Sequence, residues 1–231
     1  MNHRFFLKPP LVAGAVHTLA GDELHHARVV RVREGEEVEV FDGAGVAFSA
    51  RFADGSVHLV EPIASRESAV DLHVAVAIIQ LEKFELVLQK ATELGARSFF
   101  PLVTERVELR PERYRGKAER WSRIVFEAVK QSGRSAIPVV HPPTPFAEVL
   151  AASGAKILFD ADADPSPATQ PAGSVTLLIG PEGGWSEEEL AAARAAGCVV
   201  ERLGHRRLRA ETAGIVATAL IAARCGELSP R

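Results

Sequence analysis

The sequence predicts an α/β protein in which a small, β-rich domain precedes a larger domain built on a mostly parallel sheet. In the first 70 residues, short runs of alternating apolar and polar residues are separated by glycine turns, which is typical of small antiparallel barrels. Beyond residue 70, buried apolar runs alternate with segments of helical periodicity, which is typical of successive β-α units. The 231 residues, 47% of them hydrophobic, suffice for a sizeable core in one large domain or two smaller ones.

The first domain is predicted from three alternating runs, at residues 37–41, 46–52 and 57–61. Turn residues separate the runs at 43–45 and 54–55, and one short helix is expected near residues 22–28. The polar stretch 64–71 then interrupts the pattern, as an interdomain hinge would. We therefore expect two domains, at residues 1–70 and 71–231.

The second domain is predicted from strands and helices that follow one another along the chain. Apolar runs predict strands at residues 72–79, 98–103, 156–159, 175–179 and 199–203. Helical patterns occupy residues 84–94, 112–131, 146–152, 186–196 and 211–224. This alternation predicts a mostly parallel sheet that helices cover on both faces.

Composition and motif searches exclude several classes of protein. The formal charge of −3 and the globular composition argue against disorder. The N-terminal segment lacks the continuous apolar core of a signal peptide, and no apolar run approaches the roughly 20 residues of a membrane helix. The chain has two cysteines without CxxC spacing and no HExxH, GxGxxG, GxxxxGK[ST] or GxSxG motif. We expect a cytoplasmic protein with no membrane partner, no disulfide framework and no metal.

The segment LLIGPEGGWSEEEL, residues 177–190, places a glycine-rich loop between a strand and a helix. Ser186 and Glu189 have the spacing of a capping box, so we expect the helix to begin there. In parallel sheets, ligands bind at the carboxyl ends of strands, where glycines allow close approach and helix N-termini offer free N–H groups. A tight turn without a ligand would also explain this segment.

The segment RLGHRRLRAETAGIVATAL, residues 202–220, repeats the same order of strand end, loop and helix. Here the loop is basic, from Gly204 to Arg209, and the first helical turn contains Glu211 and Thr212. Two such loops at one sheet edge predict a small-ligand pocket beside an anionic polymer. Alternatively, Glu211 only complements the helix dipole and the arginines form a solvated loop.

A third segment, residues 97–134, carries 10 basic and 5 acidic side chains. Arginine forks match phosphate oxygens, so the segment is a candidate phosphate-binding surface; a solvated helix face would have the same composition.

Together these segments resemble the SPOUT superfamily of methyltransferases, and within it the ribosomal RNA small subunit methyltransferase E family. The resemblance covers nearly the whole chain. It rests on six segments: HHARVVRV (25–32) with FDG (41–43), QKATELGA (89–96), PLVTERVELR (101–110), EAVKQSGR (127–134), IGPEGGWS (179–186) and LGHRRLRAETA (203–213).

This resemblance implies a PUA-like RNA-binding barrel followed by a SPOUT domain with a trefoil knot at about residues 175–225. It further implies a homodimer that uses S-adenosylmethionine to methylate N3 of a uridine in 16S rRNA, in the decoding region of the small ribosomal subunit. The chain departs from the family at residues 81–85 and at Lys130, which weakens the assignment of RNA contacts.

Three sets of residues are carried over or inferred on this basis. Cofactor contacts are expected from Ile179, Gly180, Pro181, Glu182, Gly183, Gly184, Leu203, Gly204, Leu208, Thr212 and Ala213. RNA contacts are expected from Arg4, Arg28, Arg31, Arg106 and Arg134. Uracil N3 must lose its proton and its carbonyl oxygens gain charge, so Arg209 is the candidate for stabilising the anion and Glu211 for positioning it or accepting the proton.

Two other classes of function compete with this interpretation. A non-catalytic RNA-binding or ribosome assembly protein could have the same fold, and the two departures and the basic segment favour it. A nucleotide-dependent hydrolase could use the GPEGG loop, but no lysine or metal-binding carboxylate accompanies that loop.

Overall fold

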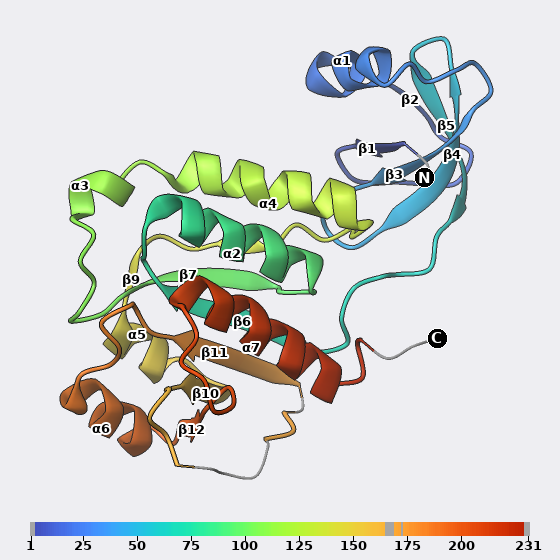
Figure 1. The fold of residues 1–231 in the computed structure, drawn as a ribbon. Coiled ribbons are helices and arrows are strands. Elements are labelled where there is room, and N and C mark those ends of the chain that lie inside the picture. Colours follow the sequence, from blue (N-terminus) through green and yellow to red (C-terminus); the bar gives the residue numbers. More distant parts are fainter. Residues whose placement is uncertain (1–2, 165–168, 172, 229–231) are drawn as a thin grey trace. The chain divides into compact units, whose positions relative to one another are not determined.

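The computed structural model describes residues 3–164, 169–171 and 173–228 (Figure 1). The chain divides into two compact units. The first unit comprises the residues up to Glu67 together with the later segment Val129–Ile137, and the second unit comprises Ser68–Ala128 and the residues from Pro138 onward. The domain division predicted near residue 70 stays a prediction, and the sequence analysis did not foresee that Val129–Ile137 groups with the first unit.

The first unit contains a five-stranded sheet with the strand order β1-β3-β4-β5-β2. Its strands are β1 (Arg4–Phe6), β2 (Val16–Thr18), β3 (Glu37–Phe41), β4 (Ala47–Ala53) and β5 (Ser56–Pro62), and the helix α1 spans Gly21–Val29. Alternating residues of β3 and β4, such as Val38, Val40 and Ala50, are fully buried. This confirms the three predicted strands and the predicted helix.

The edges of this sheet differ from the prediction. Three-residue strands β1 and β2 are too short to show alternation, so the sequence analysis missed both. β1 also pairs in parallel with β3, whereas the other pairs are antiparallel as predicted. The parallel pairing joins Arg4 with Glu39, 35 positions apart, so no local turn signal predicts it.

The second unit contains a sheet with the order β12-β10-β11-β6-β7-β8, and β9 also pairs with β7. All of its pairs are parallel, as predicted. The strands are β6 (Asp71–Ala77), β7 (Ser98–Val103), β8 (Val139–Val140), β9 (Thr144–Pro145), β10 (Ala155–Phe159), β11 (Ser174–Ile179) and β12 (Val199–Glu201). Because all strands are parallel, the loops after β10, β11 and β12 leave the same edge of the sheet.

Helices cover both faces of this sheet (Figure 1). They are α2 (Leu81–Glu93), α3 (Pro111–Tyr114), α4 (Ala118–Ser132), α5 (Phe146–Ala151), α6 (Glu187–Ala195) and α7 (Ala210–Arg224). On one face, α7 packs on β6, β11 and α2; on the other, α5 contacts β7 and α6. The close approach of α2 and α7 requires Gly214, where a Cβ would lie 3.1 Å from Val87 Cγ1.

One predicted helix is divided in two. The pattern over residues 112–131 predicted a continuous helix, but α3 ends at Tyr114 and α4 begins at Ala118. Gly116 lies between them with φ +76°, a left-handed conformation that interrupts helical hydrogen bonding.

Among the described residues, none of the helices has the length and the apolar character that a membrane span requires. The trefoil knot stays a prediction.

Candidate functional site

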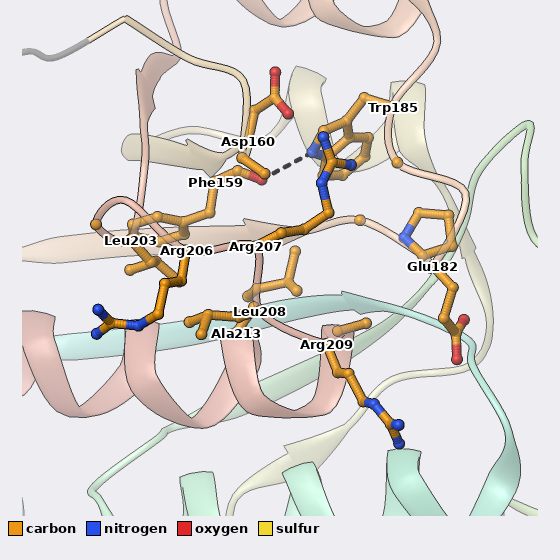
Figure 2. A pocket seen from close by; sticks show the side chains of 17 residues that line it. Phe159, Asp160, Glu182, Trp185, Leu203, Arg206, Arg207, Leu208, Arg209 and Ala213 are labelled. Atoms are coloured by element: carbon orange, nitrogen blue, oxygen red, sulfur yellow. Dashed lines mark hydrogen bonds between the residues drawn. The ribbon is translucent and has the colours of Figure 1, made fainter.

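A cavity of about 390 Å³ lies at the carboxyl edge of the sheet in the second unit (Figure 2). Its lining comes from three loops, at residues 159–161, 179–185 and 203–210, and from the first turn of α7. β10 pairs with both β11 and β12, so the sheet holds the starting points of the three loops side by side. The volume is within the range of small-molecule sites.

Most residues predicted to hold a cofactor meet in this cavity. It is lined by Ile179, Gly180, Pro181, Glu182, Gly184, Leu203, Gly204, Leu208 and Ala213, together with Arg209. Gly183, Glu211 and Thr212 are outside the lining. Helical geometry accounts for the last two, because Ala210 and Ala213 share the face of α7 that borders the cavity, whereas Thr212 lies on another face and is exposed.

Trp185 forms a wall that the sequence analysis did not predict. Trp185 is buried, and its Nε1–H donates a 3.0 Å hydrogen bond to the Phe159 carbonyl oxygen, drawn dashed in Figure 2. A Cβ on Gly180 would lie 3.0 Å from Trp185 Cε2. The indole therefore needs a glycine at 180, and it joins the loop after β11 to the end of β10.

Sequence reasoning also missed the loop after β10 and two arginines of the basic loop. Asp160, Ala161, Arg206 and Arg207 all line the cavity. The strand preceding Asp160 was predicted, but its place between β11 and β12 depends on strand order, which the sequence did not reveal. Figure 2 shows Arg206, Arg207 and Arg209 projecting in three different directions from the loop.

The predicted capping box at the start of α6 is confirmed. Glu189 N–H donates to Ser186 Oγ at 3.2 Å, and Ser186 N–H donates to Glu189 Oε2 at 3.0 Å. Glu189 is nearly buried, and its second oxygen accepts a 2.9 Å hydrogen bond from the N–H of Glu105, in the loop after β7. The same carboxylate therefore caps α6 and holds the loop after β7, which lies outside the cavity lining.

Charged side chains surround the cavity. Arg207 donates to both oxygens of Asp162 at 2.8 Å, and Lys83 lies 3.5 Å from Glu182 Oε1. These exposed pairs contribute little stability because water screens them. Arg209 is exposed and donates no hydrogen bond from its side chain to another described residue.

Glu211, the other predicted catalytic residue, lies in the first turn of α7. Its Oε2 atom is buried without a hydrogen-bond partner among the described residues. No ion pair joins it to Arg209 in the part of the chain that the structure describes. No direct contact therefore supports the prediction that Glu211 positions Arg209. Its Oε2 atom can still accept a hydrogen bond.

Two of the five predicted RNA-binding arginines, Arg4 and Arg134, are buried in the first unit. Arg4 is 8% exposed, and its guanidinium donates to Glu39 at 3.0 Å and to the Val129 carbonyl at 3.0 Å. Arg134 is 5% exposed and donates to Glu67 Oε2 at 2.6 Å. Their carboxylate partners and their burial favour a structural role over phosphate contact.

Glu67 shows how firmly this structural pair is held. Burial would raise the pKa of its carboxyl, but the Arg134 guanidinium and the N–H groups of Ala136 and Ser135 lower it below its ordinary value. Lys130 is one of the two positions at which the sequence departs from the family pattern. Its Nζ lies 3.0 Å from Glu23 Oε1, so it also has a carboxylate partner in the first unit.

The other three predicted RNA-binding arginines are exposed. Arg28 lies in α1, and Arg31 follows α1 in the first unit. Arg106 lies in the loop after β7 in the second unit, where its Nη1 donates a 3.0 Å hydrogen bond to the Gly183 carbonyl. Of these three exposed arginines, Arg106 therefore contacts the glycine loop directly. In the described residues, no group of three or more His, Cys, Asp or Glu side chains could hold a metal ion.

Comparisons with known proteins agree with this architecture. A family model described as an RNA methyltransferase domain matches residues 66–222, and one described as an RNA methyltransferase PUA domain matches residues 19–61. The ribosomal RNA small subunit methyltransferase E of Synechocystis sp. is 36% identical over 96% of this chain and 77% of its own length. That of Mycobacterium tuberculosis is 35% identical over 88% of this chain and 85% of its own.

Solved structures give the same result. The crystal structure of ribosomal RNA small subunit methyltransferase E from Neisseria gonorrhoeae, bound to S-adenosylmethionine, has a TM-score of 0.88 at 30% identity, covering 96% of this chain and 98% of that one. A methyltransferase of Legionella pneumophila in complex with S-adenosylmethionine has a TM-score of 0.84 at 30% identity, with the same coverage.

The curled sheet of the first unit and the parallel sheet with its three-loop cavity in the second define an RNA methyltransferase with a PUA-like domain. These two matches cover 96% of this chain, 77% of the Synechocystis relative and 98% of the Neisseria structure. The chain belongs to the ribosomal RNA small subunit methyltransferase E family.

Proposed function

We propose that this protein transfers a methyl group from S-adenosylmethionine to N3 of a uridine in the 16S rRNA of the small ribosomal subunit, in the decoding region. The observation that carries the proposal is the cavity at the carboxyl edge of β10, β11 and β12, which contains most of the residues that the family resemblance assigned to the cofactor. Ribosomal subunits are cytoplasmic, and we place the activity there.

The residues of the cavity fit S-adenosylmethionine. Ile179, Leu203, Leu208 and Ala213 offer apolar surface for an adenine ring, and the glycine loop leaves backbone groups accessible beside it. The lining also carries charges of both signs: Asp160 and Glu182 are acidic, and three arginines are basic. A ligand with a sulfonium, an ammonium and a carboxylate group needs both.

When bound, S-adenosylmethionine supplies a methyl group on a positively charged sulfur, which a nucleophile can displace in line. The remaining task of the protein is to hold uracil N3 in attack geometry and to remove its proton. Negative charge then spreads onto the two neighbouring uracil oxygens. We propose Arg209, which lines the cavity and cannot be deprotonated at neutral pH, as the group that stabilises this charge.

We propose Glu211 as the residue that accepts the N3 proton or orients the base. Glu211 is outside the cavity lining, but it lies two residues after Arg209, and its buried Oε2 has no hydrogen-bond partner among the described residues, which supports this role. Replacing Arg209 with Ala should reduce turnover far more than S-adenosylmethionine affinity, and Arg209→Lys should recover part of the turnover. Near-normal turnover of Arg209→Ala would remove this residue from the mechanism.

We propose that residues 1–70 dock the RNA and that residues 71–231 carry the methyl transfer, with the exposed Arg28 and Arg31 on phosphates. Deleting residues 1–70 should leave cofactor binding measurable and abolish methylation. Since Val129–Ile137 belongs to the first unit, the double variant Arg28→Ala/Arg31→Ala is the milder test. It should raise KM for the small subunit and leave S-adenosylmethionine affinity unchanged. Full methylation by the truncated chain would refute this division of labour.

We propose a homodimer that uses the surface of α2 and α7. The helix α7 is apolar on most sides, and Val216 on α7 and Leu86 on α2 remain 38% and 40% exposed. Val216→Glu should therefore shift the protein to a monomer in sedimentation analysis. Val139→Glu, at an exposed apolar residue of β8, is the matched control and should leave the dimer intact.

The decisive experiment uses small subunits from a strain that lacks this protein. The subunits are incubated with the protein and labelled S-adenosylmethionine, and the modified nucleotide is mapped. We expect label on N3 of one uridine. Label on carbon or on a ribose oxygen would contradict the proposed acceptor, and a failure to bind S-adenosylmethionine in calorimetry would favour a non-catalytic RNA-binding protein.

A further inference from the structure

The loop after β7 is bonded once to the glycine loop after β11 and once to the first turn of α6, which follows that loop. Glu105 N–H donates to Glu189 Oε1 at 2.9 Å, and Arg106 Nη1 donates to the Gly183 carbonyl at 3.0 Å. β6 separates β7 from β11 in the sheet, so these bonds span the carboxyl end of an intervening strand. The capping box uses only one carboxylate oxygen of Glu189, Oε2, so Oε1 is available to accept the bond from Glu105 N–H.

Arg106 restrains one particular peptide group of the glycine loop. The carbonyl of the Gly183–Gly184 peptide accepts from Arg106, and its N–H, on Gly184, donates to the Pro181 carbonyl at 2.9 Å. Both ends of this peptide are therefore fixed. Glu182 and Gly184 line the cavity whereas Gly183 does not, so Arg106 acts on the lining from outside the cavity.

The stem of Arg106 also packs against this loop. A Cβ on Gly183 would lie 3.2 Å from Arg106 Cβ, so a larger residue there would push the Arg106 stem away by a few tenths of an ångström. The guanidinium itself is exposed, and the Gly183 carbonyl is its one hydrogen-bond acceptor among the described residues. An arginine has five N–H donors in a rigid planar fork, so several donors remain available to a phosphate.

We propose that Arg106 is a positioning residue that couples RNA binding to the cofactor cavity. One nitrogen of its guanidinium holds the Gly183 carbonyl, and the others bind a phosphate of the substrate RNA. Bound RNA then orders the glycine loop, and RNA and cofactor each raise the affinity of the enzyme for the other. This inference rests on the proposed function, because it requires both ligands.

Lysine and alanine variants separate this role from a general contribution of charge. Arg106→Lys keeps the positive charge, but its single ammonium lacks the fork that contacts a carbonyl and a phosphate together. Arg106→Ala removes both contacts. Arg194→Ala, at an exposed arginine in the last turn of α6, is the matched control.

The experiment measures the dissociation constant of S-adenosylhomocysteine with and without unmethylated small subunits, and then turnover. For the wild type and Arg194→Ala, we expect the subunits to tighten binding about fivefold or more, the usual lower range of coupling between two sites. Arg106→Ala and Arg106→Lys should lose this tightening and should turn over more slowly, and the Lys variant should keep most of its subunit affinity.

The possible outcomes discriminate between the inference and the proposed function. Coupling that persists in either Arg106 variant, or full turnover of Arg106→Lys, would overturn the inference. The absence of coupling in the wild type would overturn it as well. A wild-type protein that neither binds S-adenosylhomocysteine nor methylates subunits would instead refute the proposed function.

Discussion

Gly180 offers a direct test of how the cavity is built, because its replacement by alanine adds a single methyl group against Trp185. The new Cβ would lie 3.0 Å from Trp185 Cε2, 3.1 Å from Nε1 and 3.3 Å from Cδ2. Gly180 does not have a positive φ, so the alanine backbone itself is unstrained. The effect of Gly180→Ala therefore comes only from this steric contact.

The indole cannot move away without cost. Its N–H is bonded to the Phe159 carbonyl at 3.0 Å, and the Phe146 ring lies 5.1 Å away, centroid to centroid. Overpacking of this kind usually costs about 1–3 kcal/mol. If the cofactor needs Trp185 in its present place, the same free energy is lost from binding, which corresponds to a rise of about 5–150-fold in Kd.

Calorimetric titration with S-adenosylmethionine measures this loss, and urea unfolding measures stability in parallel. The double variant Gly180→Ala/Trp185→Phe provides the control, because the smaller ring makes room for the methyl group. We expect the double variant to bind more tightly than the sum of the single effects predicts, as contacting residues do in a double-mutant cycle.

The reasoning would be refuted by Gly180→Ala binding S-adenosylmethionine like the wild type. It would also be refuted by strictly additive effects in the double variant, since these would show that the methyl group and the indole do not meet.

Three further changes have outcomes that the structure determines. Arg134→Ala leaves the carboxylate of Glu67 buried without its cation, and urea unfolding at pH 7 should show a loss of about 3–5 kcal/mol; a loss below 1 kcal/mol would contradict the structural role. Burial opposes the ionised form of Glu201, but hydrogen bonds from Thr169 and Arg224 lower its pKa below the ordinary 4.5. The ionised carboxylate of Glu201 therefore stabilises the fold fully above pH 4.5, and this stabilisation is lost as the pH falls through its lowered pKa. In Glu201→Gln, the free energy of unfolding should fall less steeply as the pH is lowered. An unchanged decrease would exclude Glu201 as a cause of acid destabilisation. Finally, KM for small subunits should rise with salt, and Arg31→Ala should reduce the logarithmic salt dependence by about one unit; an unchanged slope would argue against a phosphate contact.

Elements with a local signal could be predicted from the sequence. The capping box at Ser186 and Glu189 requires residues only three positions apart, and the structure confirms it. The parallel arrangement of the second unit follows from strands that alternate with helices, because a chain crossing back through a helix enters the next strand in the same direction. The break between α3 and α4 was missed although Gly116 marked it, because charged residues on either side continued the helical pattern.

The wall of the cavity formed by Phe159, Asp160 and Trp185 was not predictable in this way. Phe159 and Trp185 are 26 residues apart, and their hydrogen bond exists because β10 pairs with β11. The burial of Arg4 and Arg134 is of the same kind. The sequence analysis predicted both as exposed cations. They are buried because each pairs with a carboxylate far away in the chain, Arg4 with Glu39 and Arg134 with Glu67.

The sequence by itself determined the α/β class and the two loops that line most of the cavity, because each depends on the periodicity or the spacing of residues close together in the chain. The family followed from the resemblance of six short segments to a known family, and the comparisons confirm it. Tertiary structure decided which loops meet, which arginines remain exposed and how Arg106 reaches Gly183. The physical reason is that strand order and burial depend on contacts between residues far apart in the chain, and local patterns carry no information about those partners.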